Sequence, residues 1–176
     1  EGGHRVPLIA RWPGRIPPGQ VSKQLANTTD IFATVASVVG FPLADDVAVD
    51  SVDLMPAMLG IQDEQDPIRP HMLTQSFRGE FQLRKADWKY LNHRGSGGNN
   101  YDRGNLQKYA LQETAPEADG QLFHLADDPG ETTNLFFTEP EKRQELQKLL
   151  KKLTAKSGGR SAPRNRKPID WAAQQR

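Results

Sequence analysis

The side chains best suited to binding an anion lie around one predicted loop. Residues 95–105 are rich in glycine and asparagine, a composition that predicts a loop and no regular element. His93 and Arg94 precede this segment, which adds amide donors, a tyrosine and basic groups suited to a polyanion. Loops often carry binding specificity. A surface loop without a ligand would have the same composition, so both interpretations remain open.

Two pairs of adjacent aspartates raise the question of a metal site. Asp45 and Asp46 form one pair, and Asp127 and Asp128 form the other. Hard cations bind carboxylates, but the side chains of adjacent residues seldom point at one ion. Asp127 also begins an Asp-Asp-Pro-Gly sequence, which is typical of a turn whose side chains bond nearby backbone amides. We therefore assign no metal ligand.

The composition excludes several kinds of site. The 176 residues include no cysteine, which excludes disulfides, thiolate metal sites and a cysteine nucleophile within this stretch. The formal net charge is +1, so overall charge favours neither nucleic acid nor a membrane as a partner. No apolar run approaches the roughly 20 residues needed to span a bilayer. His71 and His124 lie at predicted strands, and we interpret them as strand residues and not as ligands.

Two elements are predicted in the first forty residues. Residues 6–12 form a short apolar run closed by a Pro-Gly turn, which predicts a buried strand. A helix is predicted to begin at Asp30, after several possible N-caps, and to end near Gly40. Apolar residues recur in it at helical spacing, namely Ile31, Phe32, Val35, Val38 and Val39. Residues 62–70 are polar and contain two prolines, which favours a linker between subdomains.

The second half of the chain predicts an antiparallel sheet and one long helix. The predicted strands begin at Met72 and cover residues 81–84, 88–91 and 122–125. Residues 140–156 predict an amphipathic helix. Its apolar stripe consists of Leu146, Leu149, Leu150 and Leu153. From residue 157 onward the chain is a basic, proline-containing tail that we expect to be disordered and solvated.

The opening of the chain carries a recognisable series of motifs. Glu1-Gly2-Gly3-His4-Arg5-Val6-Pro7 is followed by Trp12-Pro13-Gly14. These segments resemble type I, formylglycine-dependent sulfatases, in which an E-G-G-x-R-x-P strand leads into a W-P-G turn. Asp30-Ile31-Phe32-Ala33-Thr34 is similar to the family's D-x-x-P-T helix, with alanine in place of proline. Asp50-Ser51-Val52-Asp53-Leu54 is similar to its D-G-x-x-L segment, with serine in place of glycine.

Two later segments resemble the carboxy-terminal subdomain of the same family. Arg84-Lys85-Ala86-Asp87-Trp88-Lys89-Tyr90 is similar to its R-x-G-D-W-K-Y hairpin. Leu122-Phe123-His124-Leu125, followed by Asp127-Asp128-Pro129-Gly130-Glu131-Thr132-Thr133-Asn134-Leu135, is similar to its L-Y-D-L-x-x-D-P-x-E-x-x-N-L signature. Each motif is weak alone, but the ordered set, which extends over residues 1–163, is specific.

The resemblance implies an α/β parent protein with an alkaline-phosphatase-like catalytic domain. Residues 1–61 would be the C-terminal end of that domain. Residues 62–156 would form a small α+β subdomain with an antiparallel sheet and a C-terminal helix, and residues 157–176 would be the basic tail. On this interpretation the chain is the carboxy-terminal fragment of a longer sulfuric ester hydrolase.

The resemblance also implies where the chemistry lies. In this family a formylglycine, made from the first residue of a C/S-x-P/A-x-R motif, attacks sulfate monoesters beside a divalent cation, usually calcium. The nucleophile and most metal ligands lie upstream of the segments matched here, so we expect no catalytic or metal-binding residue in this chain, and calcium only in the full-length parent. Ser161-Ala162-Pro163-Arg164-Asn165 is the nearest string, but asparagine stands where the motif needs arginine. The fragment alone is expected to be inactive.

Three residues are the candidates for substrate binding. They are His4, His93 and Arg94. His4 lies where the first strand would enter the catalytic face, and it could reach a sulfate or a sugar hydroxyl or could instead bond backbone at a strand edge. The expected partners are a sulfate ester, for example that of a sulfated carbohydrate, and the upstream part of the catalytic domain, with no nucleic acid and no membrane. The family suggests a periplasmic or secreted location. The alternative function is a non-catalytic module that binds sulfated or anionic glycans.

Overall fold

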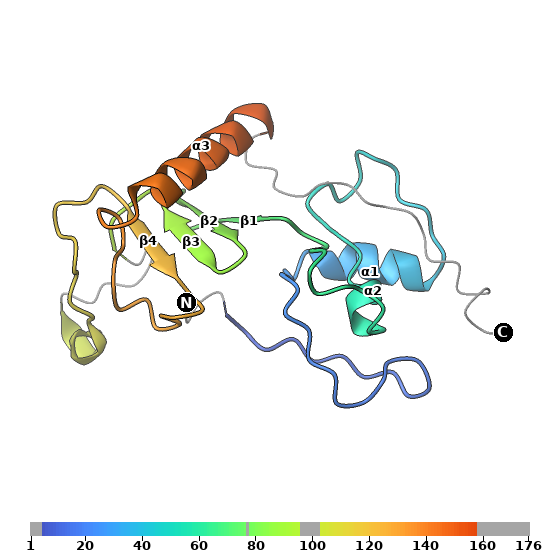
Figure 1. The fold of residues 1–176 in the computed structure, drawn as a ribbon. Coiled ribbons are helices and arrows are strands. Elements are labelled where there is room, and N and C mark those ends of the chain that lie inside the picture. The colour runs from blue at the N-terminus through green and yellow to red at the C-terminus, as the bar shows by residue number, and fades with distance from the viewer. Residues whose placement is uncertain (1–4, 77, 96–102, 158–176) are drawn as a thin grey trace. The chain divides into compact units, whose positions relative to one another are not determined.

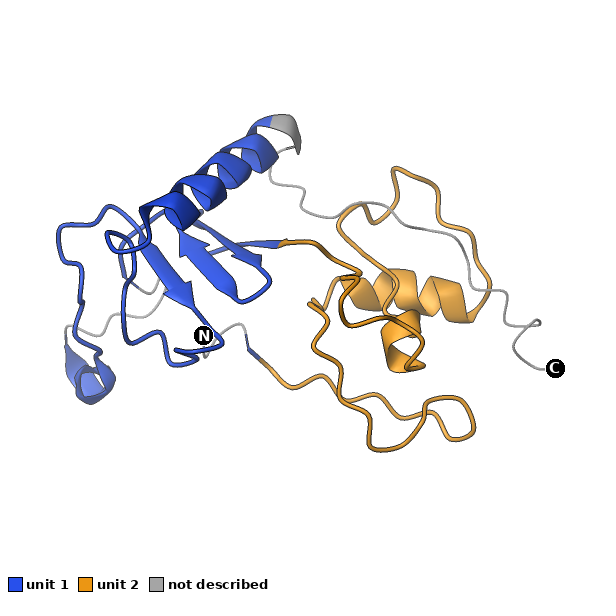
Figure 2. Cartoon of the chain, viewed as in Figure 1, with its two compact units in different colours: residues 1–5, 72–159 blue, residues 6–71, 160–176 orange. Residues whose placement is uncertain are grey.

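The chain divides into two compact units (Figure 2). The computed structural model describes residues 5–76, 78–95 and 103–157. Unit 1 consists of residues 1–5 and 72–159, and unit 2 consists of residues 6–71 and 160–176. Within these described ranges, no helix is both long enough and apolar enough to cross a bilayer. His4 and the basic tail, about which the sequence makes predictions, lie outside the described residues.

Unit 1 is built on a four-stranded antiparallel sheet in the order β1-β2-β3-β4 (Figure 1). Its strands are β1 (Met72–Gln75), β2 (Phe81–Lys85), β3 (Trp88–Leu91) and β4 (Gln121–His124). Successive side chains of a strand point to opposite faces. The register places Leu73, Leu83, Tyr90 and Leu122 in one row across the sheet. The predicted strands of this half of the chain are confirmed.

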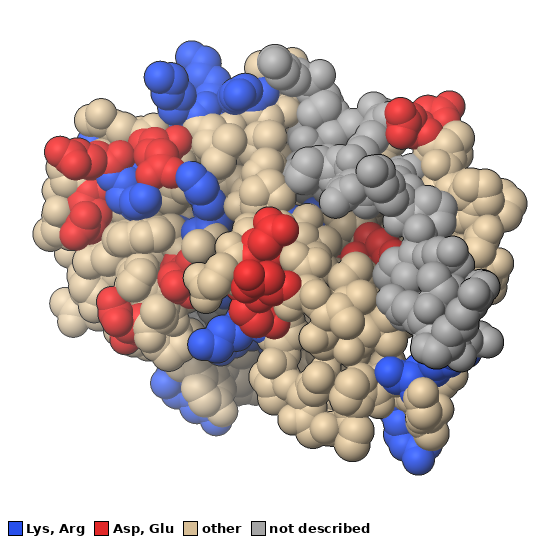
Figure 3. Space-filling view, turned by 45° about the vertical axis from the view of Figure 1, so that its right-hand side comes forward, with Lys and Arg blue, Asp and Glu red and all other residues tan. Residues whose placement is uncertain are grey.

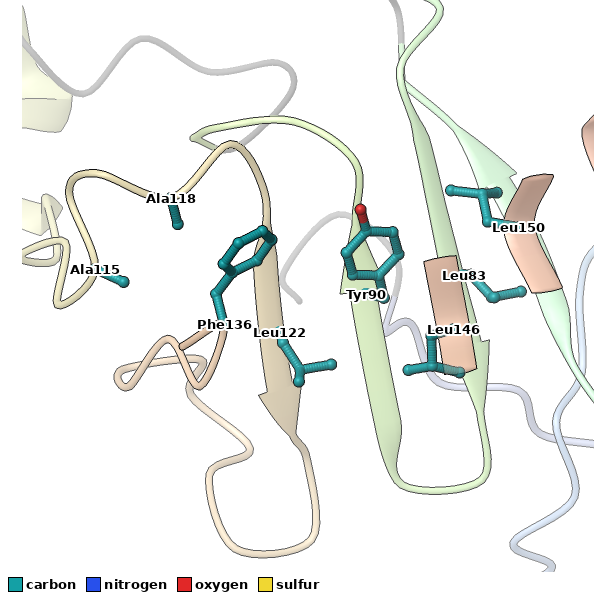
Figure 4. Close-up of a cluster of buried hydrophobic side chains, with 8 residues drawn as sticks. All are labelled: Leu83, Tyr90, Ala115, Ala118, Leu122, Phe136, Leu146 and Leu150. Atoms are coloured by element: carbon teal, nitrogen blue, oxygen red, sulfur yellow. The ribbon is translucent and has the colours of Figure 1, made fainter. Parts of the chain in front are cut away.

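Helix α3 (Pro140–Ser157) covers the face of the sheet that carries this row. Leu146 and Leu150 are buried against it, while Leu149 and Leu153 pack at the margin. The resulting core contains Leu83, Tyr90, Ala115, Ala118, Leu122, Phe136, Leu146 and Leu150 (Figure 4). Fully burying each large aliphatic side chain contributes about 1.5–3 kcal/mol. The predicted amphipathic helix and its leucine stripe are therefore confirmed.

The β2–β3 hairpin turns through two residues, since Lys85 pairs with Trp88. Ala86 has a φ of 49°, a left-handed conformation that costs a residue with a Cβ about 1–2 kcal/mol. Ala86 is also the position at which the similar sulfatase hairpin carries glycine. The predicted hairpin is confirmed, and its turn contains a residue that does not suit the backbone conformation.

The connection between β3 and β4 includes the short 3₁₀ helix η1 (Gly104–Tyr109). Gly104, at its start, has a φ of 74°, a conformation that glycine adopts readily. The prediction that residues 95–105 contain no regular element is therefore wrong for Gly104 and Asn105.

Asn134 joins three segments of unit 1. Its Oδ1 accepts hydrogen bonds from the backbone N–H of Leu122 (3.0 Å) and of Phe136 (3.1 Å). Its Nδ2 donates to Glu113 Oε1 (3.0 Å) and to the carbonyl oxygen of Gly120 (3.3 Å). The buried amide thus uses both its acceptor sites and both its N–H donors.

Unit 2 has two helices around a polar centre. They are α1 (Asp30–Val38) and α2 (Met55–Met58). The fully buried carboxylate of Asp30 accepts hydrogen bonds from the backbone N–H of Asn27 (2.7 Å) and of Val52 (3.0 Å), and it forms an ion pair with Arg69. Arg69 also donates to the carbonyl oxygen of Asp50 (3.0 Å). This network links α1 to segments that are distant in sequence.

Residues 62–71 belong to unit 2, although the sequence favoured a boundary between residues 61 and 62. Hydrogen bonds hold this segment to the earlier part of the unit. Ser22 Oγ donates to Glu64 Oε1 (2.6 Å), and the N–H of Ile68 donates to Gln24 Oε1 (2.9 Å). The division lies instead between His71 and Met72.

The helix predicted from Asp30 is confirmed, and it ends as predicted. Gly40 has a φ of 68°, and its N–H donates to the carbonyl oxygen of Ser37 (3.1 Å). The N–H of Phe41 donates to the carbonyl oxygen of Ala36 (2.8 Å). This is the hydrogen-bond pattern of a Schellman motif. Pro42 follows and prevents continuation of the helix.

One expectation for unit 2 is wrong, and the apolar stripe of its first helix is not covered. Residues 6–12 form no strand, and their side chains are exposed. The apolar stripe of α1 is also mostly exposed. The residues of α1 that are buried are instead Asp30, Ala33, Thr34, Ala36 and Ser37. These small and polar side chains face the interior of unit 2, where Asp30 and Ser51 form hydrogen bonds beside the buried Leu54 and Met55.

Candidate functional site

His93 follows β3 and is held against an acidic residue. Its side chain is only 9% exposed, and Nδ1 lies 3.7 Å from Glu80 Oε2 and 3.1 Å from the carbonyl oxygen of Arg94. Ser76 Oγ donates to the same Glu80 carboxylate oxygen (3.2 Å). A ring in this position can donate to a carboxylate when protonated, but its burial leaves little surface for a ligand.

Arg94 is exposed and weakly paired. Its Nη2 lies 3.3 Å from the carbonyl oxygen of Glu117 and 3.4 Å from Asp119 Oδ1, whose side chain is 98% exposed. An exposed pair at this distance contributes at most about 1 kcal/mol, so an anion could compete for the guanidinium. Of the three predicted substrate-binding residues, Arg94 is therefore the one whose described surroundings suit an anion.

A second histidine forms a short hydrogen bond with an aspartate. His124 Nδ1 lies 2.6 Å from Asp127 Oδ2, and its ring lies 4.5 Å from that of Trp88. A histidine–carboxylate pair can take part in acid–base chemistry. No group of three or more histidine, aspartate or glutamate side chains that could hold a metal occurs in the part of the chain that the structure describes.

The adjacent Asp128 stabilises a turn, as predicted. Its carboxylate accepts hydrogen bonds from Thr132 N (3.0 Å), Thr132 Oγ1 (2.9 Å) and Thr133 N (2.9 Å). Burial raises the pKa of the Asp128 carboxyl, but these hydrogen bonds lower it more, so the pKa lies below its usual value.

A buried ion pair connects two motifs of unit 1. Lys89 Nζ lies 2.5 Å from Glu131 Oε1, and the side chains are 6% and 14% exposed. Burial raises the pKa of the Glu131 carboxyl, but the hydrogen bond and the charge of Lys89 lower it to below its usual value. Lys89 belongs to the hairpin motif and Glu131 belongs to the later signature. Each motif therefore contains one residue of this ion pair. Spacing along the sequence could not reveal this pair.

Unit 2 has a group of large apolar side chains that are exposed, and we name it the α1 surface. It consists of Ile31, Phe32, Val35, Val39 and Phe41, whose side chains are 52–68% exposed. Ile31, Phe32 and Val35 of α1 and Val39 at its C-cap lie within about 100° of one another around the helix, at roughly 100° per residue. Large apolar groups gathered in this way mark a surface that another structure covers.

Residues 6–12 extend the apolar character of unit 2. Val6, Leu8 and Ile9 are 64%, 56% and 88% exposed, and their backbone forms no ladder with any described strand. Consecutive apolar residues without alternation are typical of strands that are covered on both faces of a sheet. The sequence predicted both segments, but it did not predict that their apolar side chains are exposed.

Comparisons with known proteins give relatives of one kind. No protein-family model matches the chain. The N-acetylgalactosamine-6-sulfatase of Canis lupus familiaris is 36% identical over 154 residues, which is 85% of this chain and 30% of that protein. The arylsulfatase A of Bos taurus is 31% identical over 165 residues, which is 87% of this chain and 30% of that protein. The chain thus spans about 30% of the length of these curated relatives.

Solved structures agree with the sequence relatives. A protein from work on glycosaminoglycan metabolism by Bacteroides thetaiotaomicron superposes with a TM-score of 0.61 at 27% identity, over 83% of this chain and 28% of that one. A second protein, solved with its substrate D-glucosamine-2-N,6-O-disulfate, superposes with a TM-score of 0.56 over 82% of this chain and 27% of that one. Its 16% identity supports likeness of fold alone.

Proposed function

Because this chain is a sulfatase-like carboxy-terminal portion, we propose that it completes the fold of a longer enzyme that hydrolyses sulfate monoesters. In this proposal the nucleophile and the metal ligands lie in the preceding part of that enzyme. The function of this chain is to complete the catalytic α/β domain and to add the α+β subdomain formed by unit 1.

The α1 surface is the observation that carries this proposal. Five large apolar side chains are each about half exposed, and covering them contributes roughly 1 kcal/mol per side chain. In an alkaline-phosphatase-like parent, residues 6–12 would join the central sheet as a strand, and α1 would pack its apolar stripe on that sheet. The strand expected at residues 6–12 would then form, and the α1 surface would be covered, in the longer protein.

Calcium belongs to this proposal only through the preceding part of the enzyme. The described residues offer no cluster of three or more carboxylate or imidazole ligands, so they do not fit a calcium site. We assign them no step that depends on the metal.

The proposed substrate class is a sulfated carbohydrate. Relatives of this chain are named for the 6-sulfate of N-acetylgalactosamine, and a neighbour of similar fold binds a disulfated glucosamine. His4, His93 and Arg94 remain the proposed substrate-binding residues, and the exposed, weakly paired Arg94 is the one whose substitution we expect to raise KM most.

The coding sequence upstream of Glu1 provides the first test. A C/S-x-P/A-x-R motif, with a lysine codon shortly before the E-G-G motif, would support the enzyme. A start codon without such a motif would contradict it and would favour the alternative of a self-standing module that binds sulfated glycans.

A matched pair of variants provides the second test. Val35→Lys places a charge in the α1 surface, while Leu111→Lys changes a side chain of similar exposure, 62% against 53%, in unit 1. In the longer protein, coexpressed with a formylglycine-generating enzyme and assayed with an aryl sulfate and calcium, we expect Val35→Lys to abolish activity and Leu111→Lys to retain it. In the 176-residue chain neither variant should lower the melting temperature. Full activity of the Val35→Lys enzyme would refute the proposal.

A further inference from the structure

The second half of α3 has an unusual charge distribution. From Leu146 to Ser157 the helix contains Lys148, Lys151, Lys152 and Lys156 and no acidic residue. Lys148, Lys151 and Lys152 are exposed, and we name these three the lysine face. At about 100° per residue they lie within roughly 100° of one another, on the side of the helix opposite Leu146 and Leu150.

The first half of the same helix is different, because it contains acidic residues and one of them pairs with two lysines. Glu145 binds both Lys142 (2.5 Å) and Lys85 of β2 (2.6 Å). By contrast, no ion pair joins a residue of the lysine face to any carboxylate in the described ranges of the chain. Figure 3 shows a group of basic side chains at the top of the view, with acidic side chains below it.

Helix stability does not account for this arrangement. Lysines in the last turn of a helix complement the helix dipole, but this effect falls off within one turn, and Lys148 lies more than two turns before Ser157. Lys148 is also three and four residues from Lys151 and Lys152, and like charges at these spacings destabilise a helix. The three charges therefore favour an external anionic partner.

We propose that the lysine face of α3 binds a sulfated polysaccharide chain as a secondary site. The three lysines lie within about one turn of the helix, so their partner must carry closely spaced anionic groups, as a sulfated sugar chain does. The formal net charge of the 176 residues is only +1, so the positive charge of the lysine face is a local feature. The choice of a sulfated glycan as the ligand rests on the proposed function, whereas the lysine face itself is observed in the structure. The site would hold a polymer on the enzyme while the catalytic domain acts on one of its sulfate esters.

The test measures binding of a chondroitin 6-sulfate octasaccharide to the 176-residue chain by calorimetry at low and moderate salt. The variant K148Q/K151Q/K152Q removes the lysine face and keeps residues that favour a helix. The variant R11Q/K23Q/R78Q removes the same charge from exposed positions elsewhere. We expect the first variant to lose about tenfold or more in affinity and much of its salt dependence, and the second to bind like the natural sequence.

Three outcomes would overturn the inference. Equal losses in the two variants would show a general effect of charge. Equal binding of unsulfated chondroitin would show that sulfate groups are not recognised. Equal binding of a DNA oligonucleotide with the same number of charges, with the same dependence on the three lysines, would identify an unspecific polyanion site.

The inference and the proposed function fail in different ways. This binding needs no catalysis and no α1 surface. If the 176-residue chain does not bind the glycan but Val35→Lys abolishes the activity of the longer protein, only the secondary site is refuted. If the lysine face binds the glycan but the longer protein keeps full activity with Val35→Lys, only the proposed function is refuted.

Discussion

Helices α1 and α3 carry similar apolar stripes, yet only one of the stripes is covered. Leu146 and Leu150 of α3 are buried on the sheet of unit 1, whereas Ile31 and Val35 of α1 are more than half exposed. Unit 1 thus contains both sides of its own core. Unit 2 instead leaves the apolar side chains of α1 exposed, and polar contacts of Asp30 link its segments. The comparison shows that periodicity identifies a face that must be covered but not the structure that covers it.

The strongest test of this comparison is the polar centre of unit 2. Asp30→Ala leaves Arg69 buried without its carboxylate and removes acceptors for two backbone N–H groups. Removing one partner of a buried ion pair typically costs about 3–5 kcal/mol, so we expect unit 2 to unfold. The control Asp119→Ala breaks an exposed pair and should cost less than about 1 kcal/mol. Hydrogen exchange followed by mass spectrometry would report each unit separately, and protection of residues 27–38 in Asp30→Ala would contradict this account.

A matched pair of truncations compares the two helices directly. Leu146→Ala creates a cavity at a fully buried position and should destabilise unit 1 by about 2–5 kcal/mol. Val35→Ala removes a side chain that is 53% exposed and should change the stability of the 176-residue chain by less than about 0.5 kcal/mol. Urea denaturation measures both. Similar losses would mean that the α1 stripe is covered within this chain.

Acid should lower the stability of unit 1 more than that of unit 2. The pKa values of Glu113, Asp128 and Glu131 in unit 1 lie below their usual range. For Glu113, burial raises the pKa, but hydrogen bonds from Ala115, Asn134 and Gln121 lower it more. A lowered pKa contributes stability above the ordinary carboxyl value, about 4, and this contribution is lost as the pH falls through the lowered pKa.

Asp53 in unit 2 has the opposite shift. Burial raises the pKa of its carboxyl by more than hydrogen bonds from Ser37 and Met55 lower it, so protonation in mild acid favours the folded unit. Calorimetry between pH 6 and pH 3 should therefore show a larger decrease of the melting temperature for unit 1. Glu113→Gln should reduce that dependence, and equal shifts of both units would contradict the assignment.

The smallest expected effect concerns the hairpin turn of unit 1. Ala86→Gly relieves a left-handed alanine, which costs about 1–2 kcal/mol, but increases the freedom of the unfolded chain by about 0.5–1 kcal/mol. We expect a net gain of roughly 0.5 kcal/mol, seen as a slightly higher melting temperature. Ala48, also left-handed with a φ of 46°, allows the same substitution in unit 2 as a comparison.

The sequence predicted unit 1 better than unit 2 for a physical reason. Its strands, hairpin and leucine stripe are local patterns, and the elements that complete the core follow within the same chain. The centre of unit 2 depends on Asp30 and Arg69, which are 39 residues apart and have no spacing that reveals their contact. The ion pair of Lys89 and Glu131 escaped prediction for the same reason. His4 and the middle of the predicted binding loop lie outside the described residues, so that part of the candidate site stays a prediction.

The amide of Asn134 determines what its motif can be used for. An aspartate there would bring a second negative charge to Glu113 and would offer no N–H to the carbonyl oxygen of Gly120, while a leucine would leave the backbone N–H groups of Leu122 and Phe136 without acceptors. The position therefore selects one residue type through folding alone, without reference to catalysis. A sequence search built on this signature would find proteins that share the subdomain, including those that have lost or never had the hydrolytic centre.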